Sequence, residues 1–198
     1  MKRGFTLIEM LVSVGLFSVA ITIIMTSLFS ITAAQRKAIA VQNAQDNLRF
    51  AFEAMTKDIR TGRYYYCGST VTDIPPTNTS TKDCPFGVNG GNSFSYQSSV
   101  GQTVTYQIWN NQLVRSSDGT QPCVPDPNII SDCQKITSPN VVIVDNIAFY
   151  VSGSGGFDNA QSFTTIVLEG KVIDPRDQTT TKINLQTSVS RRGLTDQP

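Results

Sequence analysis

The hydrophobic positions follow three successive patterns along the chain, and the first is an unbroken apolar run. From Phe5 to Ala34 nearly every residue is apolar or small, and Glu9 is the only charged residue in the run. The 25 residues from Met10 to Ala34 carry no charge, and a helix needs about 20 such residues to cross a bilayer. This pattern predicts a membrane-length helix.

After Ala34 the pattern becomes amphipathic, with apolar residues three or four positions apart. The members of this stripe are Val41, Ala44, Leu48, Ala51 or Phe52, Met55 and Ile59. Charged residues occupy the other faces, so the spacing predicts a helix that continues to about Arg60 and packs one face on a folded domain. Thr61-Gly62 is expected to end the helix, with Gly62 as a left-handed cap.

From Tyr64 onward the helical period is lost, and β-strand patterns alternate with polar turns. Strands are expected at Ser93–Val100, Thr103–Trp109, Gln112–Arg115, Val141–Val151, Phe163–Asp174 and Thr179–Arg191. Asn110-Asn111 predicts a hairpin turn because asparagine tolerates left-handed backbone conformations. Proline and glycine predict loops at 73–92 and 122–138. The fold class is therefore α+β, with one long helix packed on an antiparallel sheet.

Composition argues against catalysis and against recruitment of polyanions. The 16 basic and 15 acidic residues leave a net charge of +1, so no global field attracts nucleic acid, which is not expected as a partner. The absence of histidine removes the commonest metal ligand and the usual base near neutral pH. No nucleophile elbow, phosphate loop or paired-carboxylate motif occurs. We expect no enzyme activity, no cofactor and no metal.

Two weaker patterns have simpler interpretations. Asp126, Asp132 and Asp158 lie in expected loops, but their spacing matches no calcium-binding motif. Arg60 and Arg63 precede three tyrosines, an arrangement that could stack on single-stranded nucleic acid. Aromatic residues at the start of a β domain more often pack in its core, and exposed arginines are mostly only solvated.

All four cysteines follow the apolar run, at Cys67, Cys84, Cys123 and Cys133. An even number of cysteines beyond a membrane segment indicates two disulfides in an oxidising compartment. Four cysteines allow three connectivities. Because short loops close at lower entropic cost, we favour Cys67–Cys84 and Cys123–Cys133.

Two ordinary explanations of the N-terminus leave features unexplained. A secretory signal peptide has an apolar core of about 7–15 residues, and this run is much longer. A plain transmembrane anchor explains the length but leaves the Glu9 carboxylate unpaired in lipid, which is costly.

A third interpretation uses every feature of the N-terminus. The segment Lys2-Arg3-Gly4-Phe5-Thr6-Leu7-Ile8-Glu9 resembles the processing site of type IV pilins and of the pseudopilins of type II secretion. The resemblance implies cleavage between Gly4 and Phe5 by a membrane prepilin peptidase, followed by N-methylation of Phe5. It also implies that Glu9 is an assembly contact, whose carboxylate pairs in the fibre with the Phe5 ammonium of a neighbouring subunit.

The resemblance extends into the C-terminal part, although less specifically. The segments 105–115 and 144–150, and the helix end at 49–60, are similar to the J-type minor pseudopilin and related minor pilins. The four cysteines depart from what is usual for J-type members. The implied partners are other pilin or pseudopilin subunits, the prepilin peptidase, the inner-membrane assembly platform, and membrane lipid before assembly.

Together these expectations define an organisation and a function. The expected regions are a cleaved leader (1–4), a transmembrane and fibre-core half of the helix (5–34), an amphipathic half (35–62), an extracytoplasmic β domain (63–193) and a tail (194–198). The expected function is that of a structural minor subunit, near the tip of a secretion pseudopilus or type IV pilus. The alternative is a minor pilin that acts as an adhesin or DNA-uptake module through the loops 73–92 and 122–138.

Overall fold

The computed structural model divides the chain into two compact units, Met1–Gln42 and Asn43–Pro198. The residues that the structure describes are 4–70, 72–77, 79–85, 87, 90–117, 133–155, 161–173 and 179–192. Cys123, the aspartates at 126, 132 and 158, and the tail 194–198 lie outside this described part.

One helix, α1 (Leu7–Thr61), contains both the apolar run and the amphipathic segment. In the first unit its apolar side chains from Leu7 to Ile31 are exposed. In the second unit one stripe of the helix is buried, at Ala44, Leu48, Ala51, Met55 and Ile59. The predicted change from an all-apolar surface to a single apolar face is therefore confirmed.

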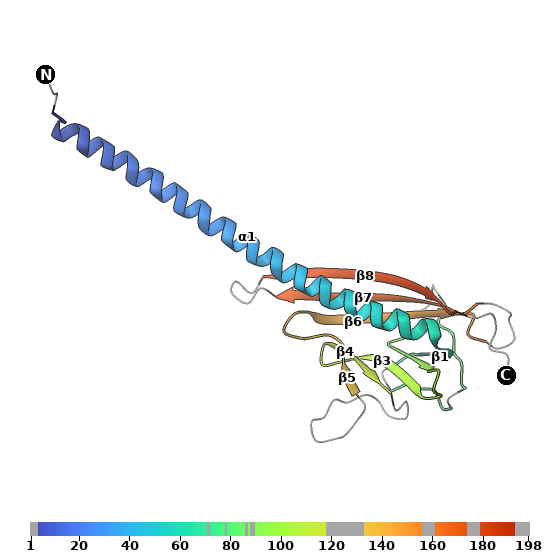
Figure 1. Cartoon of the computed structure of the whole chain (residues 1–198). Helices are drawn as coiled ribbons and strands as arrows, with labels where there is room; N and C mark the ends of the chain where they lie inside the picture. The colour runs from blue at the N-terminus through green and yellow to red at the C-terminus, as the bar shows by residue number, and fades with distance from the viewer. Residues whose placement is uncertain are drawn as a thin grey trace. The chain divides into compact units, whose positions relative to one another are not determined.

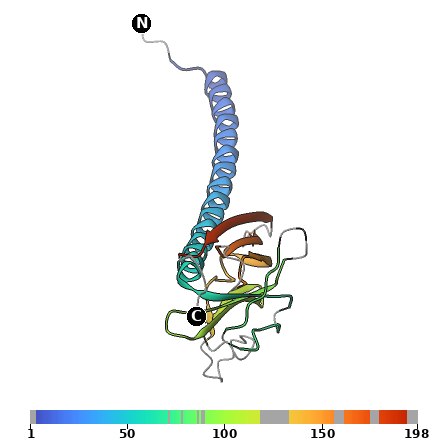
Figure 2. The ribbon, with the colours of Figure 1, turned by 90° about the vertical axis from the view of Figure 1, so that its right-hand side faces the viewer.

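The rest of the second unit consists of two antiparallel sheets (Figure 1). The first has the order β1-β2-β3-β4-β5 and the second the order β6-β7-β8. The strands are β1 (Arg63–Gly68), β2 (Ser93–Gln97), β3 (Thr103–Trp109), β4 (Gln112–Ser116), β5 (Cys133–Lys135), β6 (Ile143–Ser152), β7 (Phe163–Ile173) and β8 (Thr180–Ser190). Figure 2 shows the C-terminal part of α1 beside both sheets. The α+β architecture with one long helix and antiparallel sheets is as predicted.

Six of these strands match the predicted ones, whereas β1 and β5 were not predicted as strands. β5 has three residues inside the segment 122–138, which was expected to be only loop. It forms because Cys133 pairs with Ser116 at the edge of β4. β1 contains an irregularity between Arg63 and Tyr66 and a left-handed residue, Tyr64, with a φ of 53°. Both strands depend on pairing partners distant in sequence.

Left-handed backbone was predicted at one hairpin turn and at one helix cap, and the two predictions have different outcomes. Asn110 and Asn111 have φ values of 46° and 59°, which confirms the hairpin turn between β3 and β4. Gly62 is not among the positive-φ glycines, so the predicted left-handed cap is wrong. A Cβ at Gly62 would overlap the ring of Tyr96. Glycine is therefore required here because the end of α1 packs against a tyrosine ring.

Polar contacts attach the end of α1 to the first sheet. The Tyr106 hydroxyl donates to Asp58 Oδ2 at 2.9 Å, and Arg115 Nε donates to the same oxygen at 3.2 Å. Burial, followed by the neighbouring Tyr96 and Asp58, raises the pKa of the Tyr106 hydroxyl. The Tyr65 hydroxyl donates to the Ile59 carbonyl oxygen. These contacts add polar attachment to the burial of the apolar stripe.

Truncating the buried stripe should destabilise the second unit. Leu48→Ala, at a fully buried position, should lower the free energy of unfolding by about 2–5 kcal/mol through lost burial and a residual cavity. Urea unfolding of the detergent-solubilised chain, followed by near-ultraviolet circular dichroism, measures this. Phe50→Ala is the matched control, because Phe50 is 67% exposed on the same helix and should change stability by less than about 0.5 kcal/mol. Equal losses for the two variants would contradict the assigned packing.

Candidate processing and assembly site

The bond at which cleavage is predicted lies in an exposed, non-helical segment. Gly4, Phe5 and Thr6 precede α1 and adopt no regular secondary structure. The side chain of Phe5 is 70% exposed, and a Cβ at Gly4 would meet no atom within 4 Å. The Gly4–Phe5 peptide bond is therefore open to a protease in this conformation, and no helical hydrogen bond has to break first.

Thr6 and Glu9 together cap the beginning of α1. The Glu9 N–H donates to Thr6 Oγ1 at 3.4 Å, and the Thr6 hydroxyl donates to Glu9 Oε2 at 3.5 Å. Thr6 thus occupies the N-cap position, and Glu9 is the third helical residue, a pairing similar to the capping box. A carboxylate in the first turn also interacts favourably with the helix dipole. This role was not predicted, although Thr-x-x-Glu before an apolar run is a recognised signal in a sequence.

Within the apolar segment, six hydroxyl groups bond to backbone carbonyl oxygens of the helix itself. Ser13 Oγ donates to the Glu9 carbonyl oxygen at 2.7 Å, and Ser18 Oγ donates to the Val14 carbonyl oxygen at 2.8 Å. Thr22, Thr26, Ser27 and Thr32 make bonds of the same kind. These donors therefore need no water, and the segment is suited to lipid or to a bundle of similar helices.

The apolar surface of this segment is the largest exposed hydrophobic feature in the described part of the chain. By its length and composition, the helix is long enough and apolar enough to cross a membrane. Glu9 makes no ion pair among the described residues. The segment fits a single-pass membrane anchor, and its pairing through Glu9 with a Phe5 ammonium remains a prediction.

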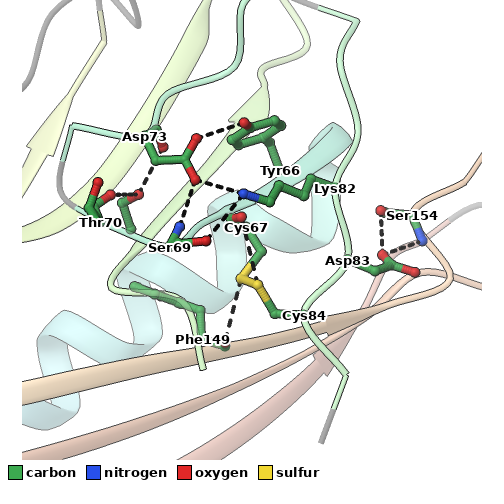
Figure 3. The surroundings of a disulfide bond; sticks show 11 residues. Tyr66, Cys67, Ser69, Thr70, Asp73, Lys82, Asp83, Cys84, Phe149 and Ser154 are labelled. Carbon is green, nitrogen blue, oxygen red and sulfur yellow. Dashed lines mark hydrogen bonds and ion pairs between the residues drawn. A yellow bond between two sulfur atoms is a disulfide. The ribbon is translucent and has the colours of Figure 1, made fainter. Parts of the chain in front are cut away.

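A disulfide links Cys67 at the end of β1 to Cys84, with a Cα–Cα distance of 5.9 Å (Figure 3). This is one of the two pairs favoured by short loop closure. Cys133 is also disulfide-bonded. Because Cys123 lies outside the described residues, the Cys123–Cys133 pairing stays a prediction.

The loop stapled by this disulfide joins the two sheets. On one side, the Cys67 N–H donates to the Lys82 carbonyl oxygen at 2.9 Å. On the other side, Cys84 exchanges two backbone hydrogen bonds of 3.0 Å with Val151, and Gly91 exchanges two of 2.8 Å with Phe149. The loop therefore bridges β1 and β6, which are the facing edges of separate sheets.

The Asp73 carboxylate fixes the course of this loop by accepting three hydrogen bonds. Its carboxylate accepts from Lys82 Nζ at 2.7 Å, from the Tyr66 hydroxyl at 2.7 Å and from the Ser69 N–H at 2.8 Å (Figure 3). Burial opposes ionisation, but the hydrogen bonds from Lys82, Ser69 and Tyr66 outweigh it and lower the pKa of Asp73 to about 2. Burial and the Asp73 carboxylate raise the pKa of the Tyr66 hydroxyl to about 12.

The structure separates the basic and aromatic residues that are adjacent in sequence at 60–66. Tyr65 is 1% exposed and packs edge-on against Phe94, while Tyr66 bonds to Asp73. These rings therefore form no stacking platform with Arg63. Arg60 instead lines a pocket with Arg192, which no local sequence pattern indicates. The three aspartates considered for calcium lie outside the described residues.

The Asp73 ion pair should give the second unit an acid-sensitive component of stability. The pKa of Asp73 is lower in the folded state, so its contribution is complete above about pH 4 and is lost as the pH falls through about 2. Asp73→Asn should cost on the order of 1 kcal/mol at about pH 6, allowing for solvent screening, and should cost almost nothing near pH 2. Urea unfolding at several pH values measures the difference. Asp145→Asn, which breaks an exposed pair with Lys171, is the control, and an equal pH-dependent loss there would contradict the assignment.

Comparison with known proteins identifies the N-terminal segment. Residues 1–25 match the family described as the prokaryotic N-terminal methylation motif. No curated protein matches the chain, and no solved structure matches it. The match covers the exposed Gly4–Phe5 bond, the Thr6–Glu9 cap and most of the apolar helix. The chain thus carries the prepilin-type methylation motif on a pilin-like α+β architecture, which supports a pilin or pseudopilin subunit processed by a prepilin peptidase.

Proposed function

We propose that the protein is a structural minor pilin or pseudopilin subunit. It is made as a prepilin, cleaved between Gly4 and Phe5, methylated at the new Phe5 amine and inserted into a helical fibre. The observation that carries this proposal is the coincidence of three features in residues 1–25: the methylation motif, the exposed Gly4–Phe5 bond and a fully exposed apolar helix. An exposed apolar helix of this length must be covered, by lipid before assembly and by similar helices afterwards.

The cysteines indicate the orientation of the precursor, whereas the flanking charges do not, because Lys2-Arg3 before the apolar run is matched by Arg36-Lys37 after it. Lys2 and Arg3 stay on the cytoplasmic side with the leader, and the second unit lies outside the cytoplasmic membrane. The Cys67–Cys84 disulfide supports this orientation, because such bonds persist in oxidising compartments. The β domain then faces outward on the fibre, near its tip, and contacts other subunits in a system that supports protein secretion. The assembly platform of the inner membrane is the partner during insertion.

The Glu9 carboxylate has a defined role in this assembly. Cleavage creates an ammonium at Phe5, and a neighbouring subunit's Glu9 neutralises it inside the apolar helix bundle. An opposite charge contributes far more there than in water, because little solvent screens the pair. Removing only one partner leaves a buried charge unpaired, which is strongly destabilising.

The mature protein should begin at an N-methylated Phe5. Mass spectrometry of the protein from cells with an active prepilin peptidase should show loss of residues 1–4 and addition of one methyl group. Cells that lack the peptidase should keep the full precursor. An intact Met1 in the presence of the peptidase, or a mature start near Gln35, would exclude the proposal.

Glu9→Ala should separate processing from assembly. Membrane insertion and cleavage should continue, whereas the amount of this subunit in sheared fibres should fall about tenfold or more, because an unpaired Phe5 ammonium would be buried. Quantitative immunoblotting of fibre and membrane fractions measures both steps. Glu169→Ala, at an exposed position of β7, is the matched control. Normal incorporation of Glu9→Ala would contradict the pairing while leaving the processing result intact.

A further inference from the structure

A cationic pocket lies at the carboxyl end of α1. It has a volume of about 400 Å³ and is lined by Glu53, Thr56, Lys57, Arg60, Thr61 and Arg192. Arg192 follows β8 and reaches the pocket because its backbone N–H donates to the Arg60 carbonyl oxygen at 3.0 Å. The end of β8 and the end of α1 are thereby joined (Figure 1). Three cationic side chains and one carboxylate thus face one space.

The three cations have no partner among the described residues. Lys57, Arg60 and Arg192 form no ion pair there. The single carboxylate of the pocket is outnumbered three to one, and it also pairs with Arg49, whose Nε lies 3.1 Å from Glu53 Oε1. The pocket therefore has an excess of positive charge.

Capping of the helix does not explain these cations. Basic side chains at a helix C-terminus often bond to its last carbonyl groups. Here other groups bond to three of the last four carbonyl oxygens: the Thr61 hydroxyl donates to that of Asp58, the Gly62 N–H to that of Ile59, and the Arg192 N–H to that of Arg60. The ammonium and guanidinium groups therefore remain available to an external anion.

A second pocket adjoins the cationic pocket along α1, and the two together form a groove. The second pocket has a volume of about 470 Å³, and it shares Glu53 and Thr56 with the cationic pocket. Phe52 on α1 and Leu185 on β8 supply its apolar surface, and both side chains are half-buried. Asp46 lies at its opposite end, away from the cations. The combined groove thus offers anion-binding groups at one end and an aromatic ring beside them.

We propose that this groove binds single-stranded nucleic acid. Phosphate oxygens would contact Lys57, Arg60 and Arg192, and an unstacked base would pack on the ring of Phe52. Guanidinium forks match phosphate oxygens in geometry. A basic groove beside an aromatic ring is the arrangement by which proteins bind single strands without reading their sequence. The net charge of the chain is near zero and gives no sign of this local excess of positive charge. Local sequence patterns do not show it either, because Arg192 is far from the helix in sequence.

Fluorescence anisotropy of a labelled oligothymidylate of about twenty nucleotides tests the proposal. The full chain, in zwitterionic detergent, should bind with an affinity that falls with salt at a log–log slope of about −2, corresponding to three phosphate contacts. Lys57→Gln, Arg60→Gln and Arg192→Gln should each weaken binding about fivefold at roughly 0.1 M salt and reduce the slope by about 0.7. Phe52→Leu should weaken binding about fivefold or more and leave the slope unchanged. Unchanged circular dichroism spectra of each variant show that folding is retained.

Matched controls identify the site and the ligand. Lys135→Gln removes an exposed charge on β5 and should leave affinity and slope unchanged. Equal losses for Lys135→Gln and Arg60→Gln would overturn the site, and duplex binding as tight as single-strand binding would overturn the contact with Phe52. Binding to anionic lipid vesicles without binding to the oligonucleotide would overturn the choice of ligand. Because the assay needs no fibre, its failure would leave the proposed assembly function standing.

Discussion

The exposed apolar surface of the first half of α1 is the constraint on which the rest of the molecule depends. Burying one large apolar side chain stabilises by about 1.5–3 kcal/mol, and the segment from Leu7 to Ile31 leaves many such side chains uncovered. Most of its hydroxyl groups bond to the helix itself, and Glu9 is its only charged residue. The segment is therefore stable in lipid or among similar helices.

The second unit is constrained differently, because it must hold two sheets and one helix together. The stripe from Ala44 to Ile59 supplies apolar burial, and the sheets also contact each other directly, as in the stacked rings of Phe94 and Phe149. The loop between Cys67 and Gly91 adds backbone hydrogen bonds between them. Backbone bonds from this loop reach β1 on one side and β6 on the other, and the disulfide and the Asp73 ion pair fix its course. The segment that the sequence predicts only as a loop, at 73–92, thus helps to link the two sheets.

The fold could be predicted from the sequence wherever a local pattern determines the structure. The helical stripe, the Asn110-Asn111 turn and six strands follow from periodicity and from backbone preferences of single residues. Local patterns could not predict β5, whose three residues pair with β4 far away in sequence, or the role of Gly62, which depends on the ring of Tyr96. At the candidate processing site, the motif at residues 2–9 was visible in the sequence. The cationic pocket around Arg60 was not, because Arg192 joins it only after folding.

The cap at the start of α1 bears on how Glu9 can serve both the precursor and the fibre. The two hydrogen bonds between Thr6 and Glu9 are 3.4 and 3.5 Å long, near the limit at which such bonds contribute. Releasing the carboxylate from Thr6 therefore costs little, and the Thr6 hydroxyl can go on accepting from the Glu9 N–H. In the proposed fibre, a charged ammonium replaces a weak neutral donor as the partner of Glu9. The exchange favours assembly only after cleavage, because the Phe5 amine is part of a neutral peptide bond until then.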